Sequence, residues 1–328
     1  MKYLNNSFYV EKRSIKSLTT KHGTPLYCYS YKKLKDNINK FKKIFKQISP
    51  LICFSVKSNS NVSLLKEMRK NGLGADVVSK GELYAALKAG INKNKIVFSG
   101  VGKTMEELEY AINKNILLIN SESLSEVLTI EKIANKRKKL VNIGLRLNPN
   151  TDAKTLKQIS TGKSENKFGV DKQTFIKIVN TMKKSKFIKI KCLSVHIGSQ
   201  ILSYKPYKQM LSVLDKLLNS INYKFEYIDL GGGMGIKYDL NSKVLNYKKY
   251  SDEVKKFKEK HNCKIIFEPG RSIIGNIAIL ASKIIYLKHN KQKVFVILDA
   301  AMNDLIRPAL YNAKHRIIPS VRNNSKSK

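Results

Sequence analysis

The feature that most constrains the fold of this chain is a repeat of eight short apolar runs, each of which ends in polar residues or glycine. The runs are residues 51–57, 75–79, 96–100, 116–120, 142–147, 191–196, 227–231 and 263–268. The stretches between them carry apolar residues at helical spacing, most clearly from Tyr207 to Ile221. Repeated strand-then-helix units of this size predict an α/β protein built on a (β/α)8 TIM barrel, which usually needs about 250 residues.

The two ends of the chain differ in character from this repeat. Residues 8–10 and 25–29 before it, and 272–282 and 293–298 after it, have the pattern of strands. We therefore expect both ends to build one smaller, incomplete β domain beside the barrel. The expected boundaries are 1–30 for the first part of the β domain, 31–272 for the barrel, 273–320 for the rest of the β domain and 321–328 for a disordered tail.

The residues that close the apolar runs are the candidates for chemistry, because barrel enzymes carry their active sites at the C-terminal ends of the strands. These residues are Lys57, Asp76, Ser79, Ser99, Asn120, Arg146, His196, Gly231, Gly232, Gly233, Glu268, Pro269, Gly270 and Arg271. Lys57 is the most informative, since burial of an ammonium group is costly unless it is paired, deprotonated or covalently bonded. In a dry pocket Lys57 would have a depressed pKa and would form a Schiff base with a carbonyl. The alternatives are solvent exposure or an ion pair with a carboxylate such as Asp76.

Two segments near the end of the barrel suit a phosphate. The glycine-rich residues 231–235 follow the seventh run and 268–271 follow the eighth, where barrels commonly bind phosphate. Tight turns use the same glycines, which is the alternative interpretation. Next to them His196 is placed to lie over a flat aromatic cofactor, although a lone histidine is often structural.

The remaining candidates are charged. Glu268 would keep a pyridinium nitrogen protonated, or alternatively would form a salt bridge with Arg146 or Arg271. Arg271 and Arg307, together with the hydroxyl of Tyr311, would clamp a carboxylate through paired hydrogen bonds. A lysine, a phosphate cradle, a histidine platform and a carboxylate together indicate pyridoxal phosphate.

Composition and charge narrow the choice of cellular compartment and of binding partners. The four cysteines show no C-x-x-C spacing, which favours free thiols in a reducing compartment over disulfides or a metal site. No secretion signal is recognisable and no apolar run approaches the ~18 residues of a membrane span, so we expect a cytoplasmic protein without a membrane partner. The net charge of +39 suits a polyanion partner. Because the lysines are spread along every predicted helix, a bias toward Lys and Asn on solvated faces is favoured, and no specific nucleic-acid partner is expected.

From about residue 23 to residue 320 the chain resembles the diaminopimelate decarboxylases, which belong to the alanine-racemase-like group IV decarboxylases. The resemblance rests on segments 54–61 (FSVKSNSN), 74–83 (GADVVSKGEL), 159–162 (ISTG), 166–169 (NKFG), 196–200 (HIGSQ), 231–233 (GGG), 268–271 (EPGR) and 299–311 (DAAMNDLIRPALY). The last segment distinguishes this family from alanine racemases and from decarboxylases of amino acids with cationic side chains.

The resemblance implies decarboxylation of meso-2,6-diaminopimelate to L-lysine and CO2, the last step of lysine biosynthesis, by a pyridoxal 5'-phosphate-dependent homodimer. It implies that Lys57 holds the cofactor as a Schiff base and that His196 stacks on its ring. Arg271, Arg307 and Tyr311 would bind the distal carboxylate of the substrate. The full set of expected cofactor contacts is Lys57, Asp76, Arg146, His196, Ser199, Gly232, Gly233, Glu268, Pro269, Gly270 and Arg271, with no metal.

Three departures from the family pattern bear on activity. Leu156, Lys157 and Gln158 stand where the family usually has histidine, proline and tyrosine, and Ser58 stands where alanine is usual. The sequence ends at Lys328, whereas family members continue for several tens of residues. That part would carry a cysteine-glutamate-serine motif that reaches across the dimer interface. We therefore expect weak cofactor binding or a fragment of an active enzyme, with exposed apolar surface that favours aggregation.

Three other functions stay open at this point. A decarboxylase or racemase of the same fold could act on another amino acid, but a distal ammonium would call for acidic residues in place of the two arginines. A non-catalytic pyridoxal phosphate carrier is the second. Nucleic-acid binding would rest on charge alone.

Overall fold

The computed structural model describes residues 1–155, 159–163, 165–238 and 244–322. The chain divides into two compact units. One comprises Ile38–Ile236 and Lys243–Ile274, and the other comprises Met1–Asn37, Lys237–Ser242 and Gly275–Lys328. Each unit is described by itself below, as the barrel unit and the β unit.

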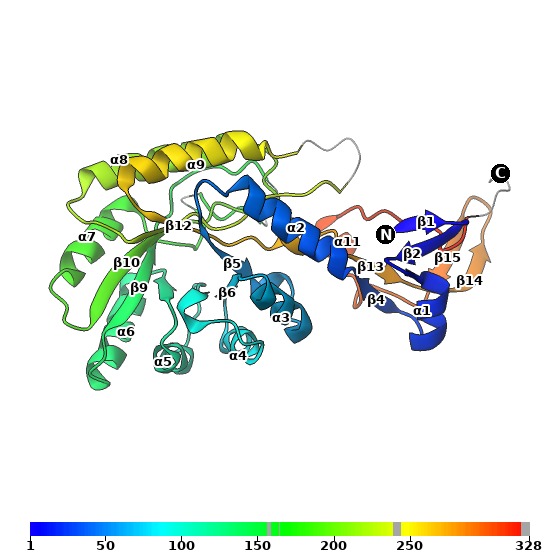
Figure 1. The fold of residues 1–328 in the computed structure, drawn as a ribbon, viewed down its shortest axis with the longest axis horizontal. Coiled ribbons are helices and arrows are strands. Elements are labelled where there is room, and N and C mark those ends of the chain that lie inside the picture. The colour runs from blue at the N-terminus through cyan, green and yellow to red at the C-terminus, as the bar shows by residue number, and fades with distance from the viewer. Residues whose placement is uncertain (156–158, 164, 239–243, 323–328) are drawn as a thin grey trace. The chain divides into compact units, whose positions relative to one another are not determined.

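The barrel unit contains a closed barrel of eight parallel strands. Figure 1 labels β5, β6, β9, β10 and β12 among them. In chain order the strands are β5 (Leu51–Ser55), β6 (Gly74–Val77), β7 (Ile96–Phe98), β8 (Leu118–Ser121), β9 (Val141–Arg146), β10 (Ile188–Ser194), β11 (Tyr227–Asp229) and β12 (Lys264–Phe267). Each overlaps one of the apolar runs, and β12 pairs with β5 to close the ring. The predicted TIM barrel is therefore confirmed.

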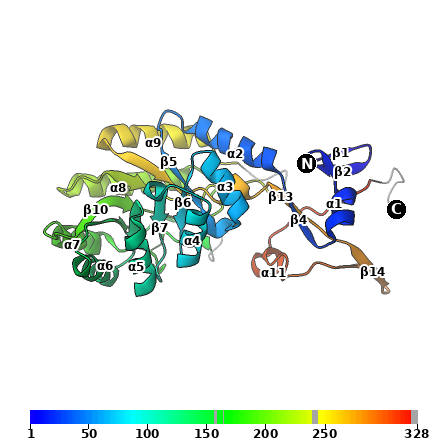
Figure 2. The same ribbon diagram turned by 60° about the horizontal axis from the view of Figure 1, so that its bottom comes forward.

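Helices surround the barrel (Figure 2). They are α3 (Val62–Lys70), α4 (Lys80–Lys88), α5 (Met105–Lys114), α6 (Leu124–Lys136), α7 (Lys172–Met182), α8 (Lys205–Ser220), α9 (Tyr247–His261) and the short α10 (Arg271–Ile274). Polar residues start several of them: the Ser79 side chain caps α4, and Thr104 forms a capping box with Glu107 at the start of α5. Among the described residues, no helix has both the length and the apolar character that crossing a membrane would require.

Aromatic packing closes the core between the barrel wall and its helices. Phe45 is fully buried, and its ring centroid lies 4.5 Å from that of Phe267 on β12 and 5.9 Å from that of Tyr250 on α9. Inside the barrel a second cluster includes Cys53 and Cys192. All four cysteines of the chain are free and buried.

The β unit is built from both ends of the chain. It contains β1 (Lys2–Leu4), β2 (Ser7–Val10), β3 (Arg13–Ser14), α1 (Ile15–His22), β4 (Leu26–Tyr29), β13 (Ala278–Ala281), β14 (Ile284–His289), β15 (Val294–Leu298) and α11 (Arg307–Tyr311). β4 pairs with β13, which joins residues from opposite ends of the sequence. Helix α2 (Tyr31–Ile44) begins in this unit and ends in the barrel unit.

The structure differs from the sequence-based expectation at residues 272–274, and it describes only the first two residues of the predicted tail. Residues 272–274 were expected to be β-like but lie in α10, because the turn at Gly270 starts a helical segment before the strand. In the predicted tail, Val321 forms a β-bridge with Ser7 and the N–H of Arg322 donates to the carbonyl of Asn6. Residues 323–328 lie outside the described part of the chain.

Replacing Phe45 by alanine tests the aromatic core. We expect the free energy of unfolding to fall by about 3–5 kcal/mol, because the substitution removes a buried ring and leaves a cavity. The matched control is Leu140→Ala, since Leu140 is 57% exposed, and its effect should stay within about 0.5 kcal/mol. Urea unfolding followed by circular dichroism measures both, and equal effects for the two variants would contradict the core assignment.

The hairpin β14–β15 exposes apolar side chains, among them Tyr286 (70% exposed) and Val296 (51% exposed). Exposed apolar strands associate with one another, so replacing both residues by lysine should reduce concentration-dependent association. Light scattering over a concentration series measures this. The control is Tyr84→Lys on α4, which changes an exposed side chain outside the hairpin and should leave association unchanged. Equal reduction by the control would assign the association to another surface.

Candidate active site

Lys57 lies in a short 3-10 turn, Val56–Ser58, directly after β5. The register of β5 against β6 pairs Ser55 with Asp76, and the Lys57 Nζ atom lies 3.5 Å from the Asp76 Oδ2 atom. Asp76 is fully buried, whereas the Lys57 side chain is about half exposed. The ion pair considered as an alternative is therefore present.

The charge of Asp76 also decides the protonation of the lysine. Asp76 raises the pKa of Lys57 above its usual value, burial and the charge of Arg146 act in the opposite direction, and Glu268 adds to the increase. The expectation of a depressed lysine pKa is wrong for the protein without a bound cofactor, because the nearby carboxylate outweighs desolvation.

Three carboxylates, Asp76, Asp229 and Glu268, are buried within the barrel unit. Burial raises the pKa of Asp229 to about 6. Burial also raises the pKa of Glu268 well above its ordinary value, and the charges of Asp229 and Asp76 add to this increase. A cation beside Glu268 would lower this electrostatic cost.

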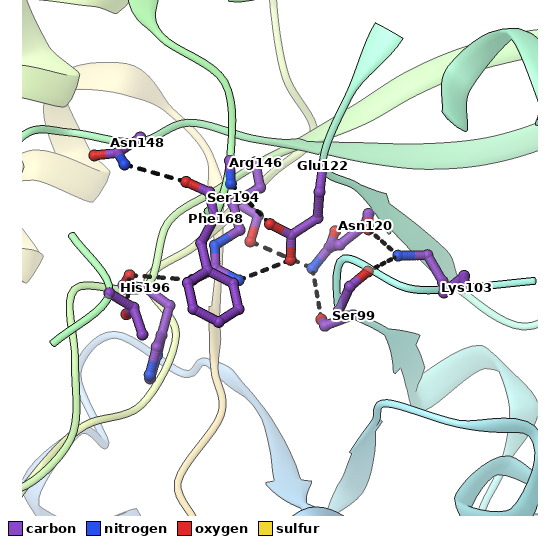
Figure 3. A network of polar contacts seen from close by, with 12 residues as sticks. Ser99, Lys103, Asn120, Glu122, Arg146, Asn148, Phe168, Ser194 and His196 are labelled. Atoms are coloured by element: carbon purple, nitrogen blue, oxygen red, sulfur yellow. Dashed lines mark hydrogen bonds and ion pairs between the residues drawn. The ribbon is translucent and has the colours of Figure 1, made fainter. Parts of the chain in front are cut away.

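Asn120, at the end of β8, connects these groups. The two hydrogens of its Nδ2 atom are shared among three oxygens: Asp229 Oδ2 at 3.1 Å, and the hydroxyls of Ser99 and Ser194, both at 3.3 Å (Figure 3). Ser99 in turn lies 3.4 Å from Glu268 Oε1. The amide has room because residue 144 on β9 is glycine: a Cβ atom there would lie 1.9 Å from Asn120 Oδ1.

His196 follows β10 and is held through both its ring and its backbone. Its Nδ1 atom accepts a hydrogen bond from the N–H of Gly232 at 3.2 Å. Its carbonyl accepts from Thr161 Oγ1 at 2.8 Å and from Arg146 Nη2 at 3.3 Å. Burial, followed by the charges of Lys57 and Arg146, places the pKa of His196 well below its usual value. The imidazole is therefore neutral, with its proton on Nε2.

The glycine turn after β11 packs closely against two other loops. A Cβ atom on Gly232 would lie 2.1 Å from the carbonyl oxygen of Glu268, and one on Gly233 would lie 2.2 Å from that of Gly198. Gly233 also has a left-handed φ of 85°. Backbone packing thus accounts for both glycines, and their contact with a phosphate stays a prediction.

The segment after β12 lies beside the end of β5. The N–H of Ser55 donates to the carbonyl of Pro269 at 3.1 Å, and a Cβ atom on Gly270 would lie 3.0 Å from Ser58 Oγ. The Nη2 atom of Arg271 lies 3.3 Å from Ser199 Oγ, so the structure brings these two predicted cofactor contacts together.

Arg307 and Tyr311 both lie on α11 of the β unit. The Arg307 guanidinium carbon lies 5.6 Å from the ring centroid of Tyr311 and 5.3 Å from that of Tyr238. Arg271 belongs to the barrel unit, so the three-residue carboxylate clamp stays a prediction. Leu156, Lys157 and Gln158, the noted departure from the family pattern, lie outside the described residues.

The sequence analysis does not predict the partner of Arg146, and it does not include Lys103, Glu122 or Asp229 among the site residues. Arg146 was considered as a partner of Glu268, but its Nη1 atom lies 2.8 Å from Oε1 of Glu122. Lys103 is also buried; its ammonium lies 2.8 Å from Glu126 and donates to the carbonyl of Asn120 at 2.9 Å. Asp229 lies within the run 227–231 and Glu122 lies two residues after the run 116–120, and these positions are the available signal in the sequence.

A TIM barrel with a lysine, buried carboxylates and a neutral histidine near its strand ends is the architecture of a pyridoxal enzyme. Residues 31–275 match the family described as "Pyridoxal-dependent decarboxylase, pyridoxal binding domain". Among curated proteins, the diaminopimelate decarboxylase of Aquifex aeolicus is 42% identical over 97% of this chain and 76% of its own length. That of Zymomonas mobilis is 38% identical over 95% of this chain and 76% of its own length.

Solved structures agree. Diaminopimelate decarboxylase from Helicobacter pylori complexed with L-lysine superposes with a TM-score of 0.88 at 41% identity, over 92% of this chain and 76% of that one. The enzyme from M. jannaschii in co-complex with L-lysine gives 0.91 at 32% identity, over 98% and 77%. The chain belongs to the diaminopimelate decarboxylase family of pyridoxal-dependent decarboxylases. The expected family and pyridoxal cofactor are confirmed.

The residues present fit such a cofactor. Asp76 Oδ1 is buried and has no hydrogen-bond partner among the described residues, and the buried carboxylate of Glu268 would be stabilised by a cationic ring nitrogen. The amine of Lys57 lies beside this acidic group. The site thus offers an amine that can bond to an aldehyde and carboxylates that can stabilise a positively charged ring.

Asp76→Asn tests the electrostatic analysis of Lys57. The substitution removes the largest contribution that raises the lysine pKa, so the midpoint of the pH profile for reductive methylation of Lys57 by formaldehyde and cyanoborohydride should move to lower pH. Mass spectrometry of the cofactor-free protein measures this profile. Asp152→Asn is the control, since Asp152 pairs with Lys163 at 3.3 Å on the surface and should not affect Lys57. An unchanged midpoint in Asp76→Asn would refute the assignment.

Proposed function

We propose that this chain decarboxylates meso-2,6-diaminopimelate to L-lysine and CO2, the last step of lysine biosynthesis, with pyridoxal 5'-phosphate. The observation that carries the proposal is the amine of Lys57 beside Asp76 and Glu268 in a barrel whose relatives are diaminopimelate decarboxylases. The L-lysine complex of the H. pylori enzyme supports this choice of product.

When bound, pyridoxal phosphate supplies an electron-accepting ring that stabilises the charge left when the carboxylate departs as CO2. Lys57 would hold the cofactor covalently and Asp76 would orient its amine. Glu268, buried beside two other carboxylates, would hold a proton at the ring nitrogen. His196, being neutral, would pack its flat ring without adding charge. The phosphate would be held by Ser199, Gly232, Gly233 and the 269–271 segment. Arg146 would also contact the cofactor.

The distal carboxylate of the substrate would be bound by Arg271, Arg307 and Tyr311, because guanidinium groups bind carboxylates through paired hydrogen bonds. A distal ammonium would find two cations in this set, which disfavours substrates such as ornithine. The homodimer and the cytoplasmic location inferred from the sequence belong to this proposal.

Lys57→Ala tests the function. Wild-type protein incubated with pyridoxal phosphate should show the absorbance band of a lysine-bound cofactor and should release CO2 from meso-diaminopimelate. The alanine variant should lose the band and at least about a thousandfold in turnover, because the covalent anchor is gone. Lys66→Ala on α3, a lysine outside the site, is the control.

Three other outcomes would contradict the proposal in different ways. A band that persists in Lys57→Ala would exclude Lys57 as the anchor. A band without CO2 release in the wild type would favour the carrier function. CO2 release from another amino acid but not from meso-diaminopimelate would favour a different substrate.

A further inference from the structure

Glu122 is a buried carboxylate to which the proposed chemistry gives no role. It follows β8 directly and is 6% exposed. Oε1 lies 2.8 Å from Arg146 Nη1, and Oε2 accepts the N–H of Gly169 at 2.8 Å. Both oxygens are therefore engaged, one by a charged donor and one by the backbone of the loop after β9. Charge-assisted hydrogen bonds of this kind are short and strong, so they fix the groups that they join.

Arg146 extends the contact toward the site. It ends β9 and is 7% exposed. Its guanidinium carbon lies 4.8 Å from the ring centroid of Phe168, and its Nη2 atom lies 3.3 Å from the carbonyl oxygen of His196 (Figure 3). Held by a carboxylate, an aromatic face and a carbonyl, the planar guanidinium has little freedom to rotate.

His196 connects Arg146 to Gly232. Its carbonyl is held by Arg146 and Thr161, and its ring accepts from the N–H of Gly232. A shift of the backbone at His196 therefore changes the direction of the imidazole and the hydrogen bond to Gly232. Gly232 is the last residue in the series Glu122, Arg146, His196, Gly232. Among the described residues no direct hydrogen bond joins Gly232 to Glu122 or Arg146.

We propose that Glu122 is a positioning residue that sets the orientation of His196 through Arg146. The proposal deepens the proposed function and rests on it in one respect, namely that His196 faces the cofactor. The physical link between Glu122 and His196 does not depend on a cofactor and can be measured without one.

The first experiment uses the cofactor-free protein and compares Glu122→Gln with wild type. Glutamine replaces one of the two carboxylate oxygens by an NH2 group, which cannot accept a hydrogen bond, so the contact with either Arg146 or Gly169 is lost. We expect the amide hydrogen of Gly232 to exchange about tenfold faster, since the bond to His196 Nδ1 loosens when coupled contacts are broken. Hydrogen exchange followed by NMR measures this single amide. Unchanged exchange at Gly232 would overturn the proposal.

A matched control separates this effect from the loss of any ion pair. Glu109 Oε2 lies 3.0 Å from Arg137 Nη2, and both side chains are about one third exposed. Glu109→Gln should leave exchange at Gly232 unchanged. Equal acceleration by Glu109→Gln would show a general loss of stability and would also overturn the proposal.

The His196→Ala background tests whether the effect passes through the imidazole. His196→Ala alone should accelerate exchange at Gly232, and adding Glu122→Gln should change it little further. Additive effects would overturn the proposal, because they would mean that Glu122 reaches Gly232 by another route.

If Glu122→Gln does not fold because Arg146 is left as a buried cation, the double variant Glu122→Gln, Arg146→Met replaces it. This variant removes both charges and also breaks the link, so fast exchange at Gly232 is again expected. Wild-type exchange in the double variant would overturn the proposal.

A second readout uses the loaded protein. Glu122→Gln should bind pyridoxal phosphate about tenfold more weakly and should show reduced ellipticity in the cofactor band, while Glu109→Gln should match wild type. Wild-type affinity and ellipticity in Glu122→Gln would overturn the proposal. If wild-type protein neither binds the cofactor nor releases CO2, the proposed function fails, while the exchange at Gly232 still decides the role of Glu122.

Discussion

Repulsion among three buried carboxylates is the constraint around which this site is arranged. Asp76, Asp229 and Glu268 are all withdrawn from water, and burial together with their mutual proximity favours the protonated form of Asp229 and Glu268. Lys57 offsets part of this charge at Asp76, and Asn120 donates to Asp229. An acidic interior with one adjacent amine is suited to a cationic ring that also carries an aldehyde.

The cations around this acidic group are paired locally. Arg146 is bound by Glu122, and Lys103 is bound by Glu126. Each of these two buried cations thus has a carboxylate partner of its own, although the charge of Arg146 still lowers the pKa of Lys57 and of His196, and Lys57 is the cation in contact with Asp76. Short-range pairing also explains how a chain with a net charge of +39 maintains an acidic interior: buried charges act strongly on near neighbours, whereas solvent screens the exposed lysines.

The sequence predicted the barrel because strand-helix periodicity is a local property, and each strand then places its last residues at one end of the barrel. Lys57 and Asp76 could be placed together on this ground. The direction of the lysine pKa could not be predicted, because it depends on the register that pairs Ser55 with Asp76. Glu122 lies just beyond its apolar run and is not predicted for that reason. Close packing against the carbonyl of Glu268 requires glycine at position 232, and the contact of Gly232 with a phosphate stays a prediction.

The contact between Gly144 and Asn120 limits how this barrel can diverge. The absent side chain on β9 provides the space into which the amide of the neighbouring strand reaches. A methyl group at residue 144 would displace the Asn120 amide and would break its hydrogen bonds to the two serines and to Asp229. Residues 144 and 120 should therefore covary during evolution, because glycine at 144 is required only where residue 120 is asparagine.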